Sequence, residues 1–359
     1  MCSFILAFSG KSVVAMELSL CMIVKNEEEL LEQSLHQLCP YVQEIIVVDT
    51  GSTDRTKEIA LNFTQQVYDF PWVDDFAAAR NFSLEKASHE WVLVMDADEV
   101  ITEFKTESLR TLLSVEDLIV GRIKLINIIE GKRINERISR LFKRKLFHYE
   151  GAIHEQLVSN DGRPYSTVPL EITVEHRGYT SAVIQRTQKT ARNIALLKRE
   201  LEKCPTDPYG LYQLGKTYYL DKNYGEAAAY FKQALALPLN FHLEYVENLV
   251  ETYGYALINC ESYAETLGLI NYEKYYAGSI DYQFLIGLVS MNNGRFSQAI
   301  ERFLRCIGDK EGKIEGINSY LPKYNIAVIY ECLGYRAEAI SYYQKCGNYP
   351  AALKRLREI

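Results

Sequence analysis

Two carboxylates follow a strongly apolar run in the first third of the chain. Residues 91–95 (WVLVM) are apolar, and Asp96 and Asp98 come directly after them. If the run is a buried strand, both acids reach the same region beyond the edge of a sheet. Oxygen ligands with open positions suit Mg²⁺ or Mn²⁺, which keep bound waters and are completed by the phosphates of a substrate. An exposed turn with solvated acids is the alternative that this pattern leaves open.

A second acid ends another apolar run. Asp49 follows residues 44–48 (EIIVV), and Thr50-Gly51 come next. A carboxylate at a strand end can accept a hydrogen bond from the N–H of a base or from a ribose hydroxyl. Gly51 would let the backbone approach such a ligand closely. Asp54, a few residues on, is interpreted as a cap of the following helix, with Thr53 as the other candidate.

The surrounding pattern indicates how these acids are positioned. Apolar runs typical of buried strands alternate with amphipathic helical patterns over the first hundred residues. The strands are expected at 18–24, 44–48, 66–70 and 91–95, and the helices at 27–38, just after 54, and at 76–87. This alternation predicts a doubly wound, mainly parallel sheet, in which ligands bind where the carboxyl ends of the strands emerge. Asp49, Asp96 and Asp98 all fall at that edge.

From residue 119 the pattern changes to longer strand-like runs. They are expected at 119–129, 139–147 and 172–176, with a loop at 149–155 between them. This predicts a mixed-sheet extension that can close over the ligand cleft. A helix from about 182 to 203 follows, and Pro205 and Pro208 end it.

The second half repeats at an interval close to that of tetratricopeptide helix pairs. Small residues at 215, 254, 287 and 327 occupy equivalent positions, separated by 39, 33 and 40 residues, near the template period of about 34. The small residues would let paired helices approach, and aromatic residues such as Phe231 and Phe303 would fill the gaps between them. We therefore predict an α/β domain followed by an all-α repeat domain.

Four segments of the first half resemble a known family when they are taken together. They are LCMIVKNE at 20–27, VDTGSTD at 48–54, DFAAARN at 75–81 and DAD at 96–98. Their order and spacing resemble family-2 glycosyltransferases of the GT-A fold, over residues 17 to about 180. With the repeats, the chain is similar to the branch that contains bacterial peptide S-glycosyltransferases of glycosylated bacteriocins.

The resemblance implies a nucleotide-sugar site. Asp49 and Arg80 match positions that hold the uracil and ribose of a UDP-sugar, and Asp96 matches the first acid of the DXD-type motif, near the ribose. The end of the first strand, with Val24 and Glu27, is expected to face the nucleotide. Two alternatives remain open: Arg80 could form a salt bridge with a carboxylate of its own helix, and residues 25–27 could simply begin the first helix.

The resemblance also implies a metal. Asp98 matches the acid that coordinates Mg²⁺ or Mn²⁺, with Asp96 and His176 as further candidate ligands. A divalent ion stabilises the negative charge that gathers on a departing diphosphate. Burial as a hydrogen-bonded structural histidine is the alternative for His176.

Members of the family invert the anomeric centre, which needs one carboxylate as general base on the acceptor side. The loop at 149–155 resembles the acceptor-side loop, so Glu155 is the first candidate for the base and Glu150 the second. A thiol acceptor would need less help from the base, because its pKa lies near ~8.5. The sequence His154-Glu155 is not a zinc-protease motif, since Val158 stands where a second histidine is required.

Composition limits the other possibilities. The 359-residue chain has a net charge of −7, which argues against a sequence-independent grip on nucleic acid. It has no apolar run long enough to span a membrane. Its eight cysteines include no CxxC pair and are expected to be reduced and mostly buried. A cytoplasmic protein is therefore expected. The apolar run at 2–8 is short for a signal peptide, and no basic region precedes it. Because Met16 stands immediately before the first expected strand, residues 1–16 are interpreted as a leader of uncertain role.

These observations predict four segments: the leader at 1–16, a transferase domain at 17–181, a linker helix at 182–207 and helical repeats at 208–359. We expect an inverting glycosyltransferase that moves a hexose from a UDP-sugar to a peptide or protein acceptor, such as a Cys or Ser of a bacteriocin precursor. A homodimer through the repeats is possible. The alternatives are a transferase acting on a cell-envelope glycan or lipid-linked sugar, and a non-catalytic scaffold with a degenerate transferase domain.

Overall fold

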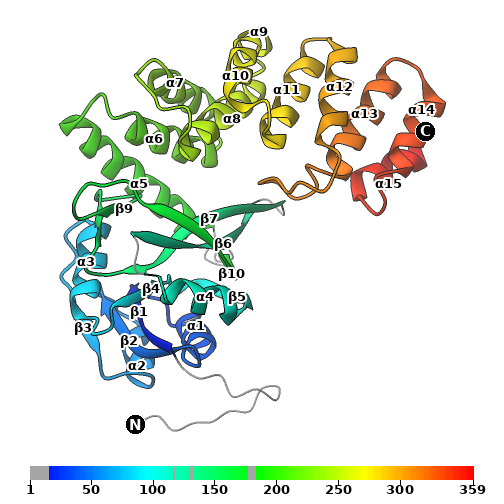
Figure 1. Ribbon diagram of the computed structural model, residues 1–359. Coiled ribbons are helices and arrows are strands. Elements are labelled where there is room, and N and C mark those ends of the chain that lie inside the picture. Colours follow the sequence, from blue (N-terminus) through cyan, green and yellow to red (C-terminus); the bar gives the residue numbers. More distant parts are fainter. Residues whose placement is uncertain (1–15, 116–117, 130–131, 177–182) are drawn as a thin grey trace. The chain divides into compact units, whose positions relative to one another are not determined.

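The computed structural model describes residues 16–115, 118–129, 132–176 and 183–359. The chain divides into two compact units, one formed by residues 1–130 and 136–182 and the other by residues 131–135 and 183–359. The expected leader and the expected boundary between 181 and 182 fall, apart from Met16, outside the described residues. The ribbon in Figure 1 labels the elements of both units.

The first unit is built on an eight-stranded mixed sheet with the order β3-β2-β1-β4-β7-β6-β10-β5. Its parallel half, β3-β2-β1-β4, holds the strands predicted from the apolar runs. β7 joins β4 antiparallel, and β5 joins β10 antiparallel. The strands are β1 (Met16–Val24), β2 (Val42–Asp49), β3 (Val67–Asp69), β4 (Trp91–Val94), β5 (Glu99–Phe104), β6 (Ile119–Ile129), β7 (Lys132–Lys143) and β10 (Ser166–His176).

Helices cover both faces of this sheet, and the alternation of side chains along each strand divides the core in two. One core joins Leu20 of β1 and Val47 of β2 to α1 (Leu31–Leu38), α2 (Thr56–Leu61) and α4 (Thr106–Leu113). The other joins Cys21 and Val48 to α3 (Phe76–Lys86) and to the hairpin β8 (Phe147–Glu150) and β9 (Gln156–Ser159). Nearly continuous apolar strands are what burial on both faces requires.

Two sequence-based predictions about elements were wrong, and three elements were not predicted. The helix predicted at 27–38 begins only at Leu31, because Asn26 adopts a positive φ of 56° and the chain turns before the helix starts. The strand predicted at 139–147 is two strands, β7 and β8, separated by a tight turn. β5, α4 and β9 were not predicted, because β9 has only four residues and the apolar residues of β5 and α4 alternate with charged or polar ones. The α/β domain with a mainly parallel core sheet is confirmed.

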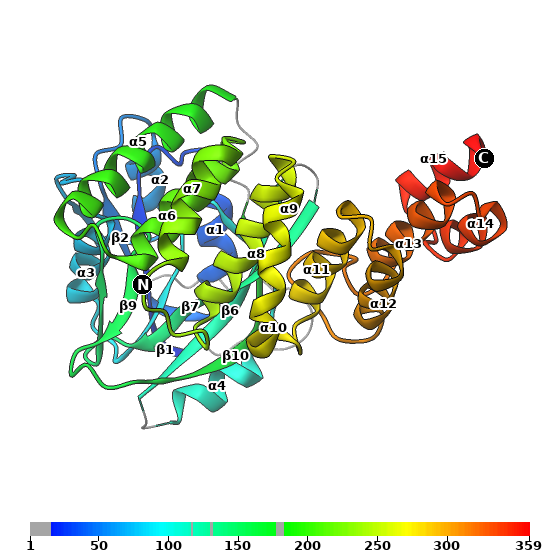
Figure 2. The ribbon, with the colours of Figure 1, turned by 90° about the horizontal axis from the view of Figure 1, so that it is seen from above.

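The second unit consists of helices, as predicted. After α5 (Val183–Lys203), antiparallel helix pairs follow one another along the chain (Figure 2). The helices are α6 (Pro208–Leu220), α7 (Tyr224–Leu235), α8 (Glu244–Asn259), α9 (Tyr263–Thr266), η1 (Leu267–Tyr272), α10 (Glu273–Tyr276), α11 (Ile280–Asn292), α12 (Phe296–Cys306), α13 (Tyr320–Cys332), α14 (Arg336–Gln344) and α15 (Pro350–Glu358). The small residues lie where helices come closest: a Cβ added at Gly215 or at Gly287 would lie 2.6 Å from the ring of Phe231 or of Phe303, respectively.

This close approach gives a prediction about stability. Gly215→Ala should lower the free energy of unfolding by ~1–3 kcal/mol, because the fully buried Phe231 ring has no room to yield. Gly225→Ala on α7 is the matched control: nothing lies within 4 Å of an added Cβ there, and a small stabilisation of up to ~1 kcal/mol is expected. Urea unfolding followed by circular dichroism measures both. Equal stability of the two variants would contradict the close packing.

The cysteines depart from the prediction in part. All seven that the structure describes are free thiols, but only Cys21, Cys306 and Cys346 are buried. The other four are exposed, so most of these cysteines are not core residues. Among the described residues, no helix combines the length and apolar character needed to cross a membrane.

Candidate functional site

The site lies where β1, β2 and β4 end. Asp49 is the last residue of β2 and is 4% exposed. Its Oδ1 accepts hydrogen bonds of 2.9 Å from the N–H groups of Gly51 and Ser52. Gly51 makes this turn possible because its φ is +101°, a region that favours glycine. The second oxygen, Oδ2, is buried and makes no hydrogen bond with a described residue. A buried acceptor of this kind calls for a donor from a ligand or a water.

The loop after β1 packs beside this turn. Val24 has a buried side chain, and its carbonyl oxygen accepts bonds from the amide and the hydroxyl of Thr50. The amide of Glu27 donates to Thr56 Oγ1 over 2.7 Å. Asp54 accepts bonds from Thr56 and from the amide of Glu28, so it joins this loop to the start of α2, whose N-cap position is Arg55. Val24 and Glu27 thus shape the β1 and β2 loops with backbone groups.

Asp96 lies between two arginines. Arg80 of α3 donates from Nη2 to Asp96 Oδ1 at 2.8 Å, and Arg140 of β7 donates from Nη2 to Oδ2 at 2.6 Å. Arg140 also donates to Glu99 at 2.5 Å, and Glu99 in turn accepts the amide of Asp96 at 3.0 Å. Arg80, Arg140 and Glu99 are all buried. The first acid of the motif is therefore held by charge-assisted bonds on both of its oxygens.

The charges of this cluster set the protonation states of its members. Burial would raise the pKa of Asp96, but Arg140 and Arg80 outweigh it and hold that pKa well below its usual range. Burial would lower the pKa of Arg80, but Asp96 and Glu155 outweigh it and raise that pKa. Burial raises the pKa of Glu99, against the opposing charge of Arg140. Asp96 is thus a carboxylate, and both arginines are cations.

Arg140 and Glu99 were not identified from the sequence as site residues. The antiparallel register pairs Leu93 of β4 with Leu141 of β7, which puts Arg140 beside the turn that follows β4. Arg140 is one of several charged residues between 136 and 145, so its residue type did not single it out in the sequence. The long-range pairing, which the periodicity did not predict, decides its position.

Asp98 points to a different partner. Its Oδ2 lies 2.9 Å from His176 Nε2, and His176 Nδ1 lies 3.1 Å from Asn127 Oδ1 of β6. β10 pairs with β5 so that His176 lies opposite Glu99, which brings the histidine next to Asp98. Burial would lower the pKa of His176, but the hydrogen bond and charge of Asp98 outweigh it and raise that pKa.

A divalent cation fits this pair better than it fits Asp96. A carboxylate and an imidazole come together at Asp98 and His176, whereas both oxygens of Asp96 are taken by arginines. The described residues form no cluster of three or more His, Cys, Asp or Glu side chains suited to a metal. Mg²⁺ is commonly held by one or two carboxylates, with substrate phosphates and waters as the remaining ligands. Two protein ligands are therefore compatible with an ion that is completed by a bound diphosphate.

The loop at 151–155 is fixed against α3. The amide of Phe76 donates to the Ala152 carbonyl at 2.8 Å, and the side chain of Asn81 both donates to and accepts from the backbone of Tyr149. Asp75 caps α3 by accepting the amide of Ala78. Residues 75–81, which begin α3, thus hold both the 151–155 loop and the end of β8 in place.

Glu155, at the end of this loop, meets the charge cluster. Its Oε1 accepts a 2.5 Å bond from Arg80 Nε, and its side chain is 14% exposed. Glu150 is exposed and lies 2.9 Å from His148 instead. The structure therefore places Glu155 in the site, with Arg80 between it and Asp96, and places Glu150 with a surface histidine. The helix carboxylates that were the alternative partners of Arg80 do not pair with it.

Three buried polar atoms in or beside this cluster have no hydrogen-bond partner among the described residues. Arg80 Nη1, Arg140 Nε and the Tyr149 hydroxyl make no hydrogen bond with a described residue. The Arg80 guanidinium lies over the Tyr149 ring, 5.7 Å from its centre. Together with Asp49 Oδ2, these atoms offer three donors and one acceptor to a polar ligand or to water.

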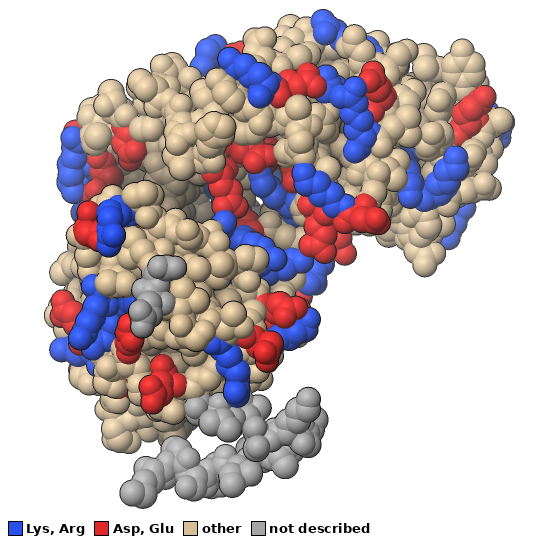
Figure 3. Space-filling model, in the orientation of Figure 1, with Lys and Arg blue, Asp and Glu red and all other residues tan. Residues whose placement is uncertain are grey.

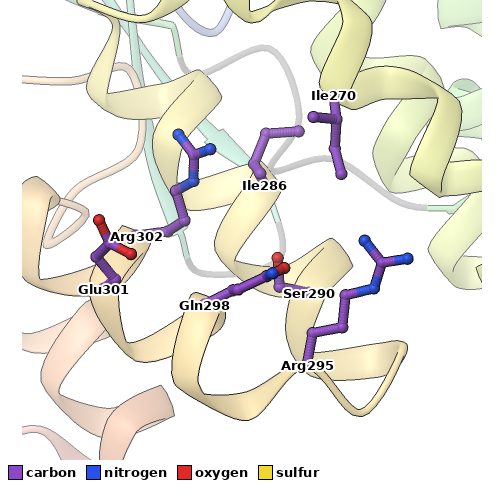
Figure 4. Close-up of a pocket in the computed structure, with 7 residues that line it drawn as sticks. All are labelled: Ile270, Ile286, Ser290, Arg295, Gln298, Glu301 and Arg302. Carbon is purple, nitrogen blue, oxygen red and sulfur yellow. The ribbon is translucent and has the colours of Figure 1, made fainter.

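The second unit has a pocket of its own. Its volume is about 320 Å³, and it lies between η1, α11 and α12 (Figure 4). Arg302, at its wall, is paired with Glu273 and Gln283. The other polar residues that line the pocket are Ser290, Arg295, Gln298 and Glu301. None of the residues that the sequence predicted for the site lines it.

The sequence matches known families in both units. Residues 19–166 match Glycosyl transferase family 2, and residues 208–237 and 324–348 match Tetratricopeptide repeat families. A TPR repeat-containing protein of Synechococcus elongatus is 33% identical over 228 residues, which cover 61% of this chain and 56% of that protein. The SPbeta prophage-derived glycosyltransferase SunS of Bacillus subtilis is 27% identical over 231 residues, which cover 60% and 52%. The chain spans about half the length of these two relatives.

A third relative matches a shorter part of the chain. The lipopolysaccharide core biosynthesis glycosyltransferase LpsC of Rhizobium meliloti is 34% identical over 109 residues, which cover 29% of this chain and 40% of that protein. The family match at 19–166 includes Asp49, the arginine cluster around Asp96, Asp98 and Glu155. Residues 19–166 of this chain are a Glycosyl transferase family 2 domain, and tetratricopeptide repeats follow it.

Proposed function

We propose that this protein is an inverting glycosyltransferase that moves a hexose from a UDP-sugar to a side chain of a peptide acceptor. One observation carries the proposal: three acidic residues follow strands that end at the same edge of the sheet. Asp49 has a buried oxygen without a hydrogen bond, Asp96 is bound by two arginines, and Asp98 pairs with His176. Family membership supports the reaction class, and the geometry supports the assignment of roles.

The donor would be held by the chain's own polar groups. Asp49 Oδ2 would accept the N–H of the uracil, since it is buried and makes no bond with a described residue. Arg80 would act at the ribose through its Nη1, while its other nitrogens hold Asp96 and Glu155. Asp96 keeps its charge because two arginines stabilise it. Its role here is to orient Arg80 and, near the ribose, to accept a hydroxyl hydrogen bond.

Asp98 and His176 would hold a Mg²⁺ or Mn²⁺ ion. Such an ion supplies direct neutralisation of the negative charge on the departing diphosphate. Because the chain has a net charge of −7, a local cation is also what allows an anionic donor to bind. His176 is oriented for this role by Asn127, whose side-chain oxygen lies beside Nδ1.

The acceptor proton would go to Glu155. Its Oε1 is engaged by Arg80, so Oε2 would be the oxygen that takes the proton. In a single in-line displacement the acceptor atom bonds to the anomeric carbon, the bond from that carbon to the UDP oxygen breaks, and the base takes the acceptor's proton. A thiol acceptor, which gives up its proton more easily than a hydroxyl, would need the least help from this base.

Glu155→Gln tests this role. Transfer should slow by ~100-fold or more, in the range of general-base catalysis, while UDP affinity changes little, because the amide oxygen can still accept the Arg80 bond. Single-turnover transfer and calorimetric UDP binding measure the two effects. Glu150→Gln, at the end of β8 just before this loop, is the matched control and should keep the parent's rate. A parent-like rate for Glu155→Gln would move the base elsewhere.

The acceptor is proposed to be a peptide because tetratricopeptide repeats form extended surfaces that bind peptides. A Cys or Ser of a bacteriocin precursor is the specific proposal. The relative LpsC, named for lipopolysaccharide core biosynthesis, favours an envelope glycan as the second candidate. Incubation with a panel of nucleotide sugars, Mn²⁺ and each acceptor class, followed by mass spectrometry, separates them. Absence of both UDP binding and donor hydrolysis would favour a non-catalytic scaffold.

A further inference from the structure

The repeat region carries an insertion that reaches back over earlier helices. The interval from residue 287 to residue 327 is 40 residues, longer than the period of about 34 residues. The extra residues lie in the connection 307–319 between α12 and α13, and a bond from the Gly308 amide to the Asn318 carbonyl closes this segment. Insertions in repeat proteins commonly lie on one face, often the binding face.

This segment places a lysine in an acidic recess between α8 and α11. Lys313 Nζ donates to Glu251 Oε2 at 2.7 Å, and the Lys313 amide donates to Asp281 Oδ1 at 2.9 Å. Glu251 and Asp281 are 4% and 8% exposed. Gly312 allows this close approach, because an added Cβ would lie 3.0 Å from Asp281 Oδ1. The recess therefore binds both the ammonium group and the backbone N–H of one lysine residue.

Lys313 alone does not satisfy the polar groups of the recess. Glu251 Oε1 and the hydroxyls of Tyr255 and Tyr276 are buried and make no hydrogen bond with a described residue. Glu247, one turn before Glu251, adds a further negative charge that acts on Glu251 and on Tyr276. Burial raises the pKa of Glu251 to about 8, which Lys313 opposes. Lys313 thus leaves three buried polar atoms of the recess without a hydrogen-bond partner among the described residues.

An acidic stripe leads into the recess from the surface. Glu244, Glu247 and Glu251 follow one another at helical spacing on α8, so they lie on one side of that helix. Their exposure falls along the stripe, from exposed Glu244 to buried Glu251. Acidic side chains gather over α8 in the space-filling view (Figure 3). A basic segment is the partner that this arrangement complements.

We propose that the recess between α8 and α11 is a docking site for a lysine-bearing extended segment of a partner polypeptide, and that Lys313 is its internal occupant. Lys313 shows which chemistry the recess selects: an ammonium on Glu251 and a backbone N–H on Asp281. A partner lysine would enter along the acidic stripe and replace the Lys313 side chain. The proposal does not depend on the transferase activity of the first unit, since binding alone tests it.

The test uses the full-length protein and a fluorescein-labelled nonapeptide of alternating Lys and Gly, with fluorescence anisotropy as the readout. The parent should bind it, and Lys313→Ala should bind at least 5-fold more tightly, because the internal competitor is removed. Adding Glu251→Gln to Lys313→Ala should weaken binding at least 10-fold. Lys310→Ala is the matched control on the same segment, since its Nζ contacts the Gly278 carbonyl instead, and it should bind like the parent. The same peptide with Glu in place of Lys should not bind.

Equal affinity of the parent and Lys313→Ala, or binding that survives Glu251→Gln, would overturn the proposal and leave Lys313–Glu251 as a purely structural ion pair. If Lys313→Ala fails to fold, as judged by circular dichroism, a substitution of the half-buried Glu247 in the otherwise unchanged parent provides the test instead. Glu247→Gln should weaken binding of the Lys peptide about 3-fold, and unchanged binding would again reject the site.

Discussion

Replacing Asp98 by Ala should reduce metal-dependent sugar transfer by more than ~100-fold, because loss of an outer-shell partner alone commonly costs 10–100-fold at metal sites. The substitution removes the carboxylate that lies 2.9 Å from His176 and leaves the imidazole as the only protein ligand of the pair. Little change in the fold is expected, because Asp98 and His176 are only partly buried and lie at the end of the sheet. Product formation from a UDP-sugar in the presence of Mn²⁺ measures the effect.

Asp161→Ala is the matched control, since Asp161 pairs with Arg163 in an exposed turn of the same unit and should keep full activity. Calorimetric titration of Mn²⁺ in the presence of UDP provides a readout that does not depend on turnover. Asp98→Ala should lose most of this binding and Asp161→Ala none of it. Undiminished metal binding and transfer in Asp98→Ala would remove the metal assignment from this pair.

Arg80→Met should lower the free energy of unfolding of the first unit by about 3–5 kcal/mol, the usual cost of removing one partner from a buried ion pair. Arg80 is 7% exposed and is bound to both Asp96 and Glu155. Asp96 keeps Arg140 when Arg80 is lost, but Glu155 keeps no charged partner. The destabilisation therefore comes mainly from the unpaired Glu155.

Both tryptophans of the chain, Trp72 and Trp91, lie in the first unit, so urea unfolding followed by tryptophan fluorescence reports on that unit alone. Arg55→Met removes an exposed pair with Glu58 and should leave stability close to that of the parent, because solvent screens such pairs. Arg80→Met combined with Glu155→Gln should recover part of the loss, because the unpaired charge is gone. Parent-like stability of Arg80→Met would show that the buried network contributes little.

The site shows where sequence reasoning succeeded and where it ended. Asp49, Asp96 and Asp98 could be predicted because each follows a buried parallel strand, and such strands end at one edge of a sheet. Their different roles could not be predicted. Asp96 and Asp98 are one residue apart, yet one is held by Arg80 and Arg140 and the other by His176.

These partners come from antiparallel pairings that local patterns do not encode. Arg140 reaches Asp96 because β7 pairs with β4, and His176 reaches Asp98 because β10 pairs with β5, itself a strand that the sequence did not reveal. The pairing of Glu155 with Arg80 likewise depends on the packing of the 151–155 loop against α3.

The sequence by itself determined the two-part architecture, the buried parallel strands, the close helix contacts at Gly215 and Gly287, and the acids at the strand ends. Each of these follows from periodicity or residue size within a short window. Only the tertiary structure decided which charged groups pair with one another. These pairs are Asp96 with Arg80 and Arg140, Asp98 with His176, and Lys313 with Glu251 between α8 and α11. The physical reason is that an ion pair between residues far apart in the chain depends on strand register and helix packing, which many distant contacts fix together.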